Sequence, residues 1–247
     1  MDIVLSNPFL SIIIPAHNEE YRLPAALEQT CSFIEAQTYD AEILVVENGS
    51  QDRTLEIAEA YCSKIPQLTV ISESQSGKGR AVRAGMLAAN GDYRFFCDVD
   101  FSMPISAVNQ FLPPVLDDVD VAIGSREAPG AKRFDEPIYR HITGRVFNTL
   151  VRRMALPGLQ DTQCGFKCFR AQVAEDVFSL QTLMGWSFDT EVLFIARHLG
   201  YQIVEVPISW YFNADSRVRL FKDSLSMGTD LLSIRRKARQ GLYELNR

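Results

Sequence analysis

Short apolar runs alternate with segments of helical period through the first half of the chain, and this alternation limits the fold more than any other feature. The apolar runs are predicted strands over Leu10 to Pro15, Glu42 to Glu47, Leu68 to Ser72, Tyr93 to Asp98 and Val119 to Gly124. Helices are predicted between them over Leu23 to Gln37, Arg53 to Lys64, Gly79 to Asn90 and Pro104 to Leu116. Nearly continuous apolar strands joined by helices predict an α/β fold, in which a mostly parallel central sheet carries helices on both faces.

The second half is less regular and is expected to complete the same sheet. Helices are predicted over Ile138 to Met154, Val173 to Phe178, Phe188 to Leu199 and Leu220 to Lys237. Strands are predicted over Phe166 to Arg170 and Gln202 to Pro207. No linker or charge block divides the 247 residues, so we expect a single domain over 1–247.

Charge and cysteine content argue against several classes of protein. The chain has 25 basic and 31 acidic side chains and a net charge of -6, which argues against general electrostatic affinity for nucleic acid. Its five cysteines form an odd number without metal-ligand spacing, which indicates a reducing, cytoplasmic setting. There is no signal peptide and no run of about 18 apolar residues, so we expect neither export nor a transmembrane helix.

Polar residues follow four of the predicted strands, and ligands bind where the carboxyl ends of parallel strands meet. Asp98 and Asp100 stand at the end of the fourth strand. Because successive strand residues alternate between faces, these carboxylates are predicted to point the same way and to share one divalent cation, Mg²⁺ or Mn²⁺, with a nucleotide diphosphate. The alternative is a solvated strand end with turn-favouring aspartates.

The segment Gly77-Lys78-Gly79 opens a predicted helix. Glycines at this position let backbone N–H groups approach phosphate oxygens, and Lys78 adds a positive charge. The segment lacks the glycine spacing and the Lys-Ser/Thr pair of a Walker loop, and no dinucleotide fingerprint follows the first strand. Both common nucleotide-binding motifs are therefore disfavoured.

The polar segments that follow the first two strands resemble a known family. Pro15 to Glu19 and Glu47 to Asp52, together with the acidic pair, are similar to family-2 glycosyltransferases of the GT-A fold, which use a nucleotide-sugar donor and invert the anomeric centre. That family usually has two aspartates where this chain has Glu47 and Asn48, which leaves the donor base open. The resemblance implies donor contacts from Pro15, Ala16, Asn18, Glu19, Glu47, Asn48, Ser50, Lys78, Asp98 and Val99.

Three later segments narrow the resemblance. Gly124 to Arg126, Asp161 to Lys167 and Trp186 to Glu191 are similar to the dolichyl-phosphate glucosyltransferase and mannosyltransferase branch, closest to the glucosyltransferases. This implies a nucleotide-sugar-binding half over about 9–125, an acceptor-side half over about 126–247, and transfer of glucose from UDP-glucose to a polyprenyl phosphate. The alternatives are GDP-mannose as the donor, a hydroxyl acceptor, and a module that binds nucleotide sugars without catalysis.

The acceptor side is expected to be cationic, because guanidinium groups bind phosphate in a bidentate manner. Arg126, Arg217 and Arg219 are our candidates for the acceptor phosphate. Gln163 and Trp186 are further acceptor-side candidates, although a turn and a place in the core explain them as well.

Catalysis is expected to need no strong base, because a phosphate acceptor is already ionised at neutral pH. We assign Asp100, Arg126 and Asp189 to the catalytic site. For Asp189, the resemblance leaves open a base for a hydroxyl acceptor or a positioning group. A cap of the following helix explains Asp189 equally simply.

Two amphipathic helices raise the question of membrane contact. The segments Ile138 to Met154 and Leu220 to Lys237 each combine an apolar face with basic residues, so either could dock peripherally on an anionic cytoplasmic leaflet. A core-packed helix with a solvated basic face is the simpler interpretation of each. The oligomeric state has no signal in the sequence.

Overall fold

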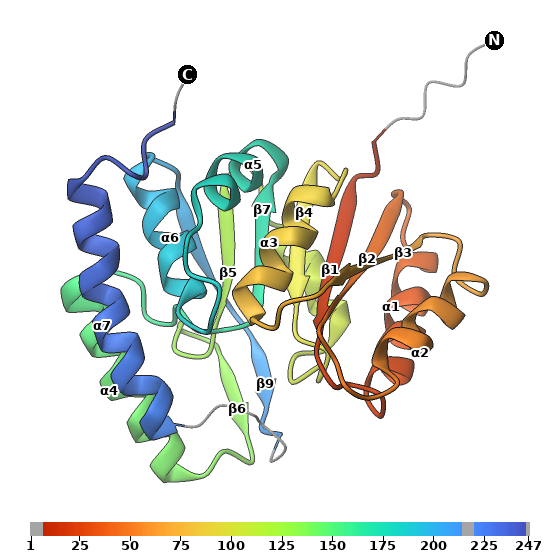
Figure 1. Ribbon diagram of the computed structural model, residues 1–247, viewed down its shortest axis with the longest axis horizontal. Helices are drawn as coiled ribbons and strands as arrows, with labels where there is room; N and C mark the ends of the chain where they lie inside the picture. Colours follow the sequence, from red (N-terminus) through yellow and green to blue (C-terminus); the bar gives the residue numbers. More distant parts are fainter. Residues whose placement is uncertain (1–6, 214–219, 246–247) are drawn as a thin grey trace.

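The computed structural model describes residues 7–213 and 220–245 and has a seven-stranded sheet at its centre (Figure 1). In spatial order the strands are β3 (Leu68–Glu73), β2 (Ala41–Asn48), β1 (Leu10–Ala16), β4 (Tyr93–Cys97), β7 (Phe166–Arg170), β5 (Val121–Ser125) and β8 (Ile203–Pro207). Only β7 runs antiparallel to its neighbours within this sheet, so the prediction of a mostly parallel sheet is confirmed. The sheet includes strands from both halves of the sequence.

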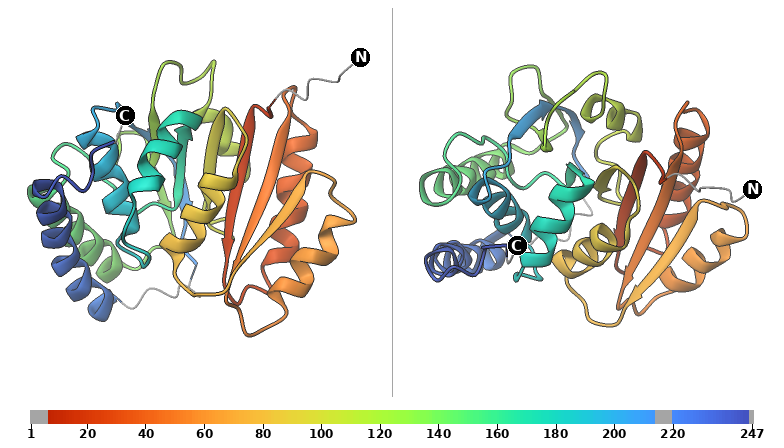
Figure 2. Two further views of the ribbon diagram at one scale, coloured as in Figure 1. Left: turned by 45° about the horizontal axis from the view of Figure 1, so that its top comes forward. Right: turned by 90° about the horizontal axis from the view of Figure 1, so that it is seen from above.

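Helices cover both faces of the sheet, as predicted (Figure 2). They are α1 (Leu23–Glu35), α2 (Thr54–Cys62), α3 (Lys78–Ala88), α4 (Ile138–Met154), α5 (Ala171–Leu180), α6 (Phe188–His198) and α7 (Leu220–Arg239). On one face, Ile12 and Ile14 of β1 pack with α1, α2 and a 3₁₀ helix, Ile105–Phe111. On the other face, Ile13 packs with the apolar side chains of α3, α5 and α6.

Strand β1 shows why the central strands read as continuous apolar runs. Ile12, Ile13 and Ile14 are each fully buried, because alternate side chains enter the cores on opposite faces. Ile13 pairs with Leu44 of β2 and with Phe96 of β4, so the ends of these three strands are in register. This register brings the segments that follow β1, β2 and β4 to the same edge of the sheet.

Two elements differ from the sequence-based expectation. The helix expected over Pro104 to Leu116 is the shorter 3₁₀ helix Ile105–Phe111, because Pro113 and Pro114 lack the N–H donors that a longer helix needs. A separate parallel pair, β6 (Lys132–Phe134) and β9 (Ser209–Tyr211), was not predicted. Strands of three residues are too short to carry a readable period.

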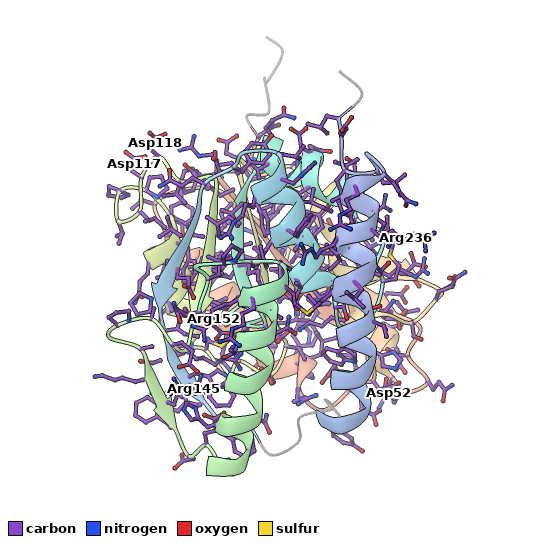
Figure 3. All side chains as sticks on the ribbon, turned by 90° about the vertical axis from the view of Figure 1, so that its left-hand side faces the viewer. Asp52, Asp117, Asp118, Arg145, Arg152 and Arg236 are labelled. Carbon is purple, nitrogen blue, oxygen red and sulfur yellow. The ribbon has the colours of Figure 1, made fainter. Side chains whose placement is uncertain are left out.

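Helices α4 and α7 lie side by side at one end of the molecule (Figure 3). Helix α7 also packs against α6, so part of its surface is covered by protein. Across the described segments, 7–213 and 220–245, every helix is too short or too polar to cross a bilayer. Peripheral docking of α4 or α7 stays a prediction.

Candidate active site

A cavity of about 370 Å³ opens at the carboxyl ends of β1, β2 and β4. This is where ligands bind in open α/β sheets. It brings together segments that are far apart in the sequence and includes most of the predicted donor contacts. Its lining residues are Pro15, Ala16, His17, Glu19, Arg22, Asn48, Ser76, Gly77, Lys78, Ala81, Asp98, Val99, Asp100, Gly185 and Trp186.

The acidic pair lies on a turn rather than on a strand. Strand β4 ends at Cys97, and the backbone N–H of Phe101 donates to the carbonyl oxygen of Asp98 at 3.4 Å. The expected reason for the alignment of Asp98 with Asp100, alternation along a strand, was therefore wrong. Both carboxylates nevertheless line the cavity, because the turn folds back on itself after the strand.

The electrostatics of the pair fit a divalent cation. Burial raises the pKa of Asp100 above its ordinary value, and the nearby charge of Asp98 raises it further. Two carboxylates held together in this way are stabilised by a hard cation, which prefers oxygen ligands. No cluster of three His, Cys, Asp or Glu side chains suited to a metal occurs among the residues that the structure describes. Asp98 and Asp100 are thus the protein's candidate ligands, and other oxygens would complete the coordination.

Lys78 lies at the first position of α3 and forms an ion pair with Asp98, with 2.7 Å between Nζ and Oδ1. Although burial opposes its charge, the carboxylates of Asp98 and Asp189 raise the pKa of Lys78. Its ammonium group also lies 5.3 Å from the centre of the Trp186 ring. Lys78 therefore adds a fixed positive charge to the cavity wall, where donor phosphates are expected.

Gly165 leaves the space that the Asp98 carboxylate occupies, and the sequence did not single it out within the Asp161 to Lys167 segment. Its carbonyl oxygen accepts the Asp98 backbone N–H at 3.2 Å. A Cβ atom at Gly165 would lie 2.1 Å from Asp98 Oδ2, closer than any real contact. Only glycine fits here while Asp98 keeps its position. The hydrophobic periodicity of the sequence does not indicate this requirement.

The two loops after β1 and β2 are joined by side-chain hydrogen bonds. The Asn18 backbone N–H donates to Ser50 Oγ at 2.9 Å, and Asn18 Oδ1 accepts the Gln51 N–H at 2.7 Å. Glu47 is buried and accepts the Ser50 N–H at 2.5 Å. Asn18, Ser50 and Glu47 were predicted donor contacts, yet they lie outside the cavity lining and hold its loops instead.

Other residues of these loops do line the cavity. Asn48 reaches across to the third strand's loop, where its Oδ1 accepts the Gly77 N–H at 2.7 Å. Glu19 is bound by Arg22 through two hydrogen bonds of 2.6 and 2.7 Å. His17 Nδ1 lies 2.7 Å from the carbonyl oxygen of Asn48. These hydrogen bonds join the loops after β1, β2 and β3 into one network along the cavity.

Arg126 lies outside the cavity lining, in an ion pair with the fully buried carboxylate of Asp161. Its Nε and Nη2 donate to the two Asp161 oxygens at 2.7 and 2.9 Å. Although burial favours the neutral acid, the Arg126 guanidinium lowers the pKa of Asp161 to about 2. Arg126 was expected to form a bidentate hydrogen bond with an acceptor phosphate, but in this structure it forms one with the Asp161 carboxylate.

Asp189 is almost fully buried and is bound to the equally buried ammonium of Lys167. Burial raises the pKa of Asp189, and the charges of Lys167 and Lys78 oppose that shift. The capping interpretation was wrong: Ser187 occupies the N-cap of α6, and Asp189 lies inside the first turn. Its position behind the cavity wall does not resemble that of a free general base.

The remaining acceptor-side candidates differ in their surroundings. Trp186 is 37% exposed and lines the cavity, so the interpretation as a core residue was wrong. Gln163 lies outside the cavity lining and donates from Nε2 to Thr190 Oγ1 at 3.0 Å. Arg217 and Arg219 lie outside the described residues.

Comparison with known proteins places the chain in a family. Residues 11–178 match the model of Glycosyl transferase family 2. The dolichyl-phosphate beta-glucosyltransferase of Drosophila melanogaster is 35% identical, over 91% of this chain and 74% of its own length. The protein of that name from Homo sapiens is 31% identical, over 96% of this chain and 78% of its own length.

Solved structures share the fold at lower identity. Glucosyl-3-phosphoglycerate synthase from Mycobacterium tuberculosis, in complex with Mn²⁺, UDP-glucose and phosphoglyceric acid, has a TM-score of 0.64 at 18% identity, over 95% of this chain and 80% of that chain. A mannosyltransferase from Pyrobaculum calidifontis, in complex with GDP-mannose and Mn²⁺, has a TM-score of 0.59 at 17% identity, over 94% of this chain and 65% of that chain. With the sheet and the cavity described above, these matches confirm the expected fold, and the chain belongs to glycosyl transferase family 2 as a glycosyltransferase of the GT-A type.

Proposed function

We propose that this enzyme transfers glucose from UDP-glucose to a polyprenyl phosphate, with inversion at the anomeric carbon. The observation that carries the proposal is the cavity in which Asp98 and Asp100 face Lys78 and the loops after β1 and β2. The names of the relatives at 31 and 35% identity support glucose as the sugar and a dolichyl-type phosphate as the acceptor.

The donor would lie along the cavity, with its nucleoside beside Pro15, Ala16 and Asn48 and its diphosphate beside Lys78. Asp98 and Asp100 would hold a divalent cation, Mg²⁺ or Mn²⁺, which supplies charge neutralisation for the leaving nucleoside diphosphate. Lys78 adds to this stabilisation from a fixed position at the start of α3. Hydrogen bonds between the loops hold the residues of the cavity in place, so that they need not reorganise during the reaction.

The state of Asp189 supports a phosphate acceptor. A hydroxyl acceptor has to lose a proton, whereas a phosphate oxygen attacks in its ionised form. Asp189 is engaged by Lys167 and lies outside the cavity lining, so it is suited to positioning that wall and poorly suited to taking a proton. For the acceptor phosphate itself, Arg217 and Arg219 remain our proposed contacts, and Arg126 would first have to release Asp161.

The reaction is tested by measuring the released nucleotide. With Mn²⁺ and a polyprenyl phosphate, we expect release of UDP from UDP-glucose at least about tenfold faster than release of GDP from GDP-mannose, which is the ratio for a difference of 1.4 kcal/mol in transition-state binding. Omission of the lipid phosphate should remove most of this release. Faster release of GDP from GDP-mannose would identify GDP-mannose as the donor. Rapid release of UDP with a hydroxyl acceptor alone would identify a hydroxyl group as the acceptor. Donor binding without turnover on any acceptor would favour a binding module.

The role of Gly165 gives a second test of the cation site. Replacing Gly165 by Ala would push the Asp98 carboxylate away, so we expect Mn²⁺ to bind about 10- to 100-fold more weakly. Gly144→Ala is the matched control, because a Cβ atom at Gly144 meets nothing within 4 Å. Calorimetric titration with Mn²⁺ measures both variants. Equal affinities in the two variants would show that the position of Asp98 is unimportant for the cation.

We also propose that the protein acts on the cytoplasmic side, in contact with a membrane surface that presents the lipid phosphate. All five cysteines are free thiols, which supports a reducing compartment. The division into a donor half and an acceptor half at residue 125 stays a prediction, and Trp186, from the second half, lines the cavity in which we propose that the donor binds.

A further inference from the structure

One wall of the donor cavity comes from beyond the segment that matches the family. Residues 181–187, the Trp186 loop, connect α5 to α6, whereas the family match ends at residue 178. Gly185 and Trp186 of this loop line the cavity, and the Trp186 ring faces the ammonium group of Lys78 at 5.3 Å. The position of this loop therefore helps to determine the shape of the cavity.

The Trp186 loop packs directly on the start of α3. The backbone N–H of Arg80 donates to the Met184 carbonyl oxygen at 3.2 Å, and Gln181 Nε2 donates to the Gly79 carbonyl oxygen at 2.9 Å. A Cβ atom at Gly77 would lie 2.6 Å from the Met184 oxygen. Because the two segments fit without spare room, a displacement of the loop would also displace Lys78, which lies between Gly77 and Gly79.

The loop is held from its other side by the fully buried carboxylate of Glu191 on α6. The backbone N–H groups of Thr182 and Leu183 donate to its Oε2 at 2.9 and 2.6 Å. The hydroxyl of Thr182 donates to its Oε1, as does the hydroxyl of Tyr243 at 2.7 Å. A buried carboxylate is costly unless it is fully bonded, so these contacts strongly favour one loop position.

The C-terminal segment completes this arrangement. Lys237 of α7 donates from Nζ to Thr182 Oγ1 at 2.5 Å and lies 3.8 Å from Glu191 Oε1. Asp230, also on α7, accepts the hydroxyl of Ser187 at 2.5 Å. Helix α7 thus binds both ends of the Trp186 loop, although it begins more than thirty residues after them in the sequence.

We propose that Glu191 and α7 form a positioning unit that sets the affinity of the enzyme for its nucleotide-sugar donor, an inference that rests on the proposed function for the identity of the donor. Glu191, Lys237 and Tyr243 touch neither the cavity nor the reacting atoms; they act through the Trp186 loop and Lys78. Loss of the unit should therefore weaken donor binding and, because Lys78 also stabilises the leaving nucleoside diphosphate, lower kcat/KM by at least the same factor. Any partner or surface that moves α7 would change donor affinity in the same way.

The test compares two neighbouring cations on α7. Lys237→Met removes the contact to Thr182, whereas Arg236→Met removes the same charge from an exposed position (Figure 3). The chain has two tryptophans, so a Trp210→Phe background leaves Trp186 as the only indole emitter. Acrylamide quenching without ligand reports the exposure of Trp186, and titration with UDP and Mn²⁺ reports donor-site affinity. Turnover of UDP-glucose separates kcat from KM.

We expect Lys237→Met to increase quenching of Trp186 and to raise the dissociation constant of UDP about threefold to tenfold, the effect of losing a charge-assisted hydrogen bond. The kcat/KM for UDP-glucose should fall by at least that factor, and Arg236→Met should match the parent. Tyr243→Phe, which removes one hydroxyl from Glu191, should shift quenching in the same direction. Equal quenching and affinity for Lys237→Met and Arg236→Met would overturn the inference. If the parent fails to bind UDP, the proposed function fails, yet the quenching comparison still decides whether α7 positions the loop.

Discussion

Replacing Asp100 by Asn is expected to lower kcat/KM for UDP-glucose by at least about 10²-fold, the usual cost of losing one group that stabilises transition-state charge. The amide keeps the shape of the side chain and removes the charge that a divalent cation needs. The same change should preserve or raise the thermal unfolding temperature measured without metal. Burial and the charge of Asp98 raise the pKa of Asp100, so its ionised form destabilises the metal-free fold at neutral pH, and a neutral side chain relieves that repulsion.

Asp117→Asn is the matched control, because Asp117 is exposed (Figure 3) and is not among the residues that line the cavity. It should change neither turnover nor Mn²⁺ binding. If Asp100→Asn retained most of its turnover and its Mn²⁺ affinity, the acidic pair would be a structural turn. A large fall in unfolding temperature would mean that Asp100 stabilises the fold instead of serving the site.

Replacing Arg126 by Met is expected to reduce the free energy of unfolding by about 3 to 5 kcal/mol, because it leaves the buried Asp161 carboxylate without its partner. Urea unfolding at neutral pH measures this loss. Arg145→Met on α4 removes the same charge from an exposed position, and surface changes of that kind usually stay within about 0.5 kcal/mol. A stable Arg126→Met variant that loses only acceptor-dependent turnover would instead restore Arg126 as an acceptor contact.

The acid dependence of stability reports the same ion pair. The pKa of Asp161 is lowered to about 2 in the fold, against an ordinary value near 3.8. The stability that this shift provides, about 2 kcal/mol, is fully present above the ordinary pKa and is lost as the pH falls towards 2. The Arg126→Met variant lacks the cause of the lowering, so this loss between about pH 4 and pH 2 should disappear from its unfolding curve.

The sheet and the edge at which the cavity lies could be predicted because their causes are local in the sequence. Ile12, Ile13 and Ile14 are apolar on both faces, and helices of readable period separate the parallel strands. The carboxyl ends of β1, β2 and β4 then have to meet, which brought Asp98, Asp100 and Lys78 to one cavity as expected. Even the strand-alternation argument, wrong for Asp98 and Asp100, led to the correct edge.

The partners of buried charges could not be predicted in this way. Arg126 with Asp161 and Lys167 with Asp189 are ion pairs between segments separated by 35 and 22 residues. A charged side chain at a strand end has the same appearance in the sequence whether it meets a ligand or a buried carboxylate. Burial decides between them, since a charge removed from water has to find an opposite charge within the fold.

The sequence by itself determined the α/β architecture, the edge of the sheet where the cavity lies and, through its motifs, the family. Only the tertiary structure decided that Trp186 faces the cavity, that Gly165 leaves space for Asp98, and that α7 reaches back to Glu191. The physical reason is the separation along the chain between the residues that interact. Periodicity and strand order arise between neighbours along the chain, whereas close packing and the bonding of buried charges depend on which distant segments meet.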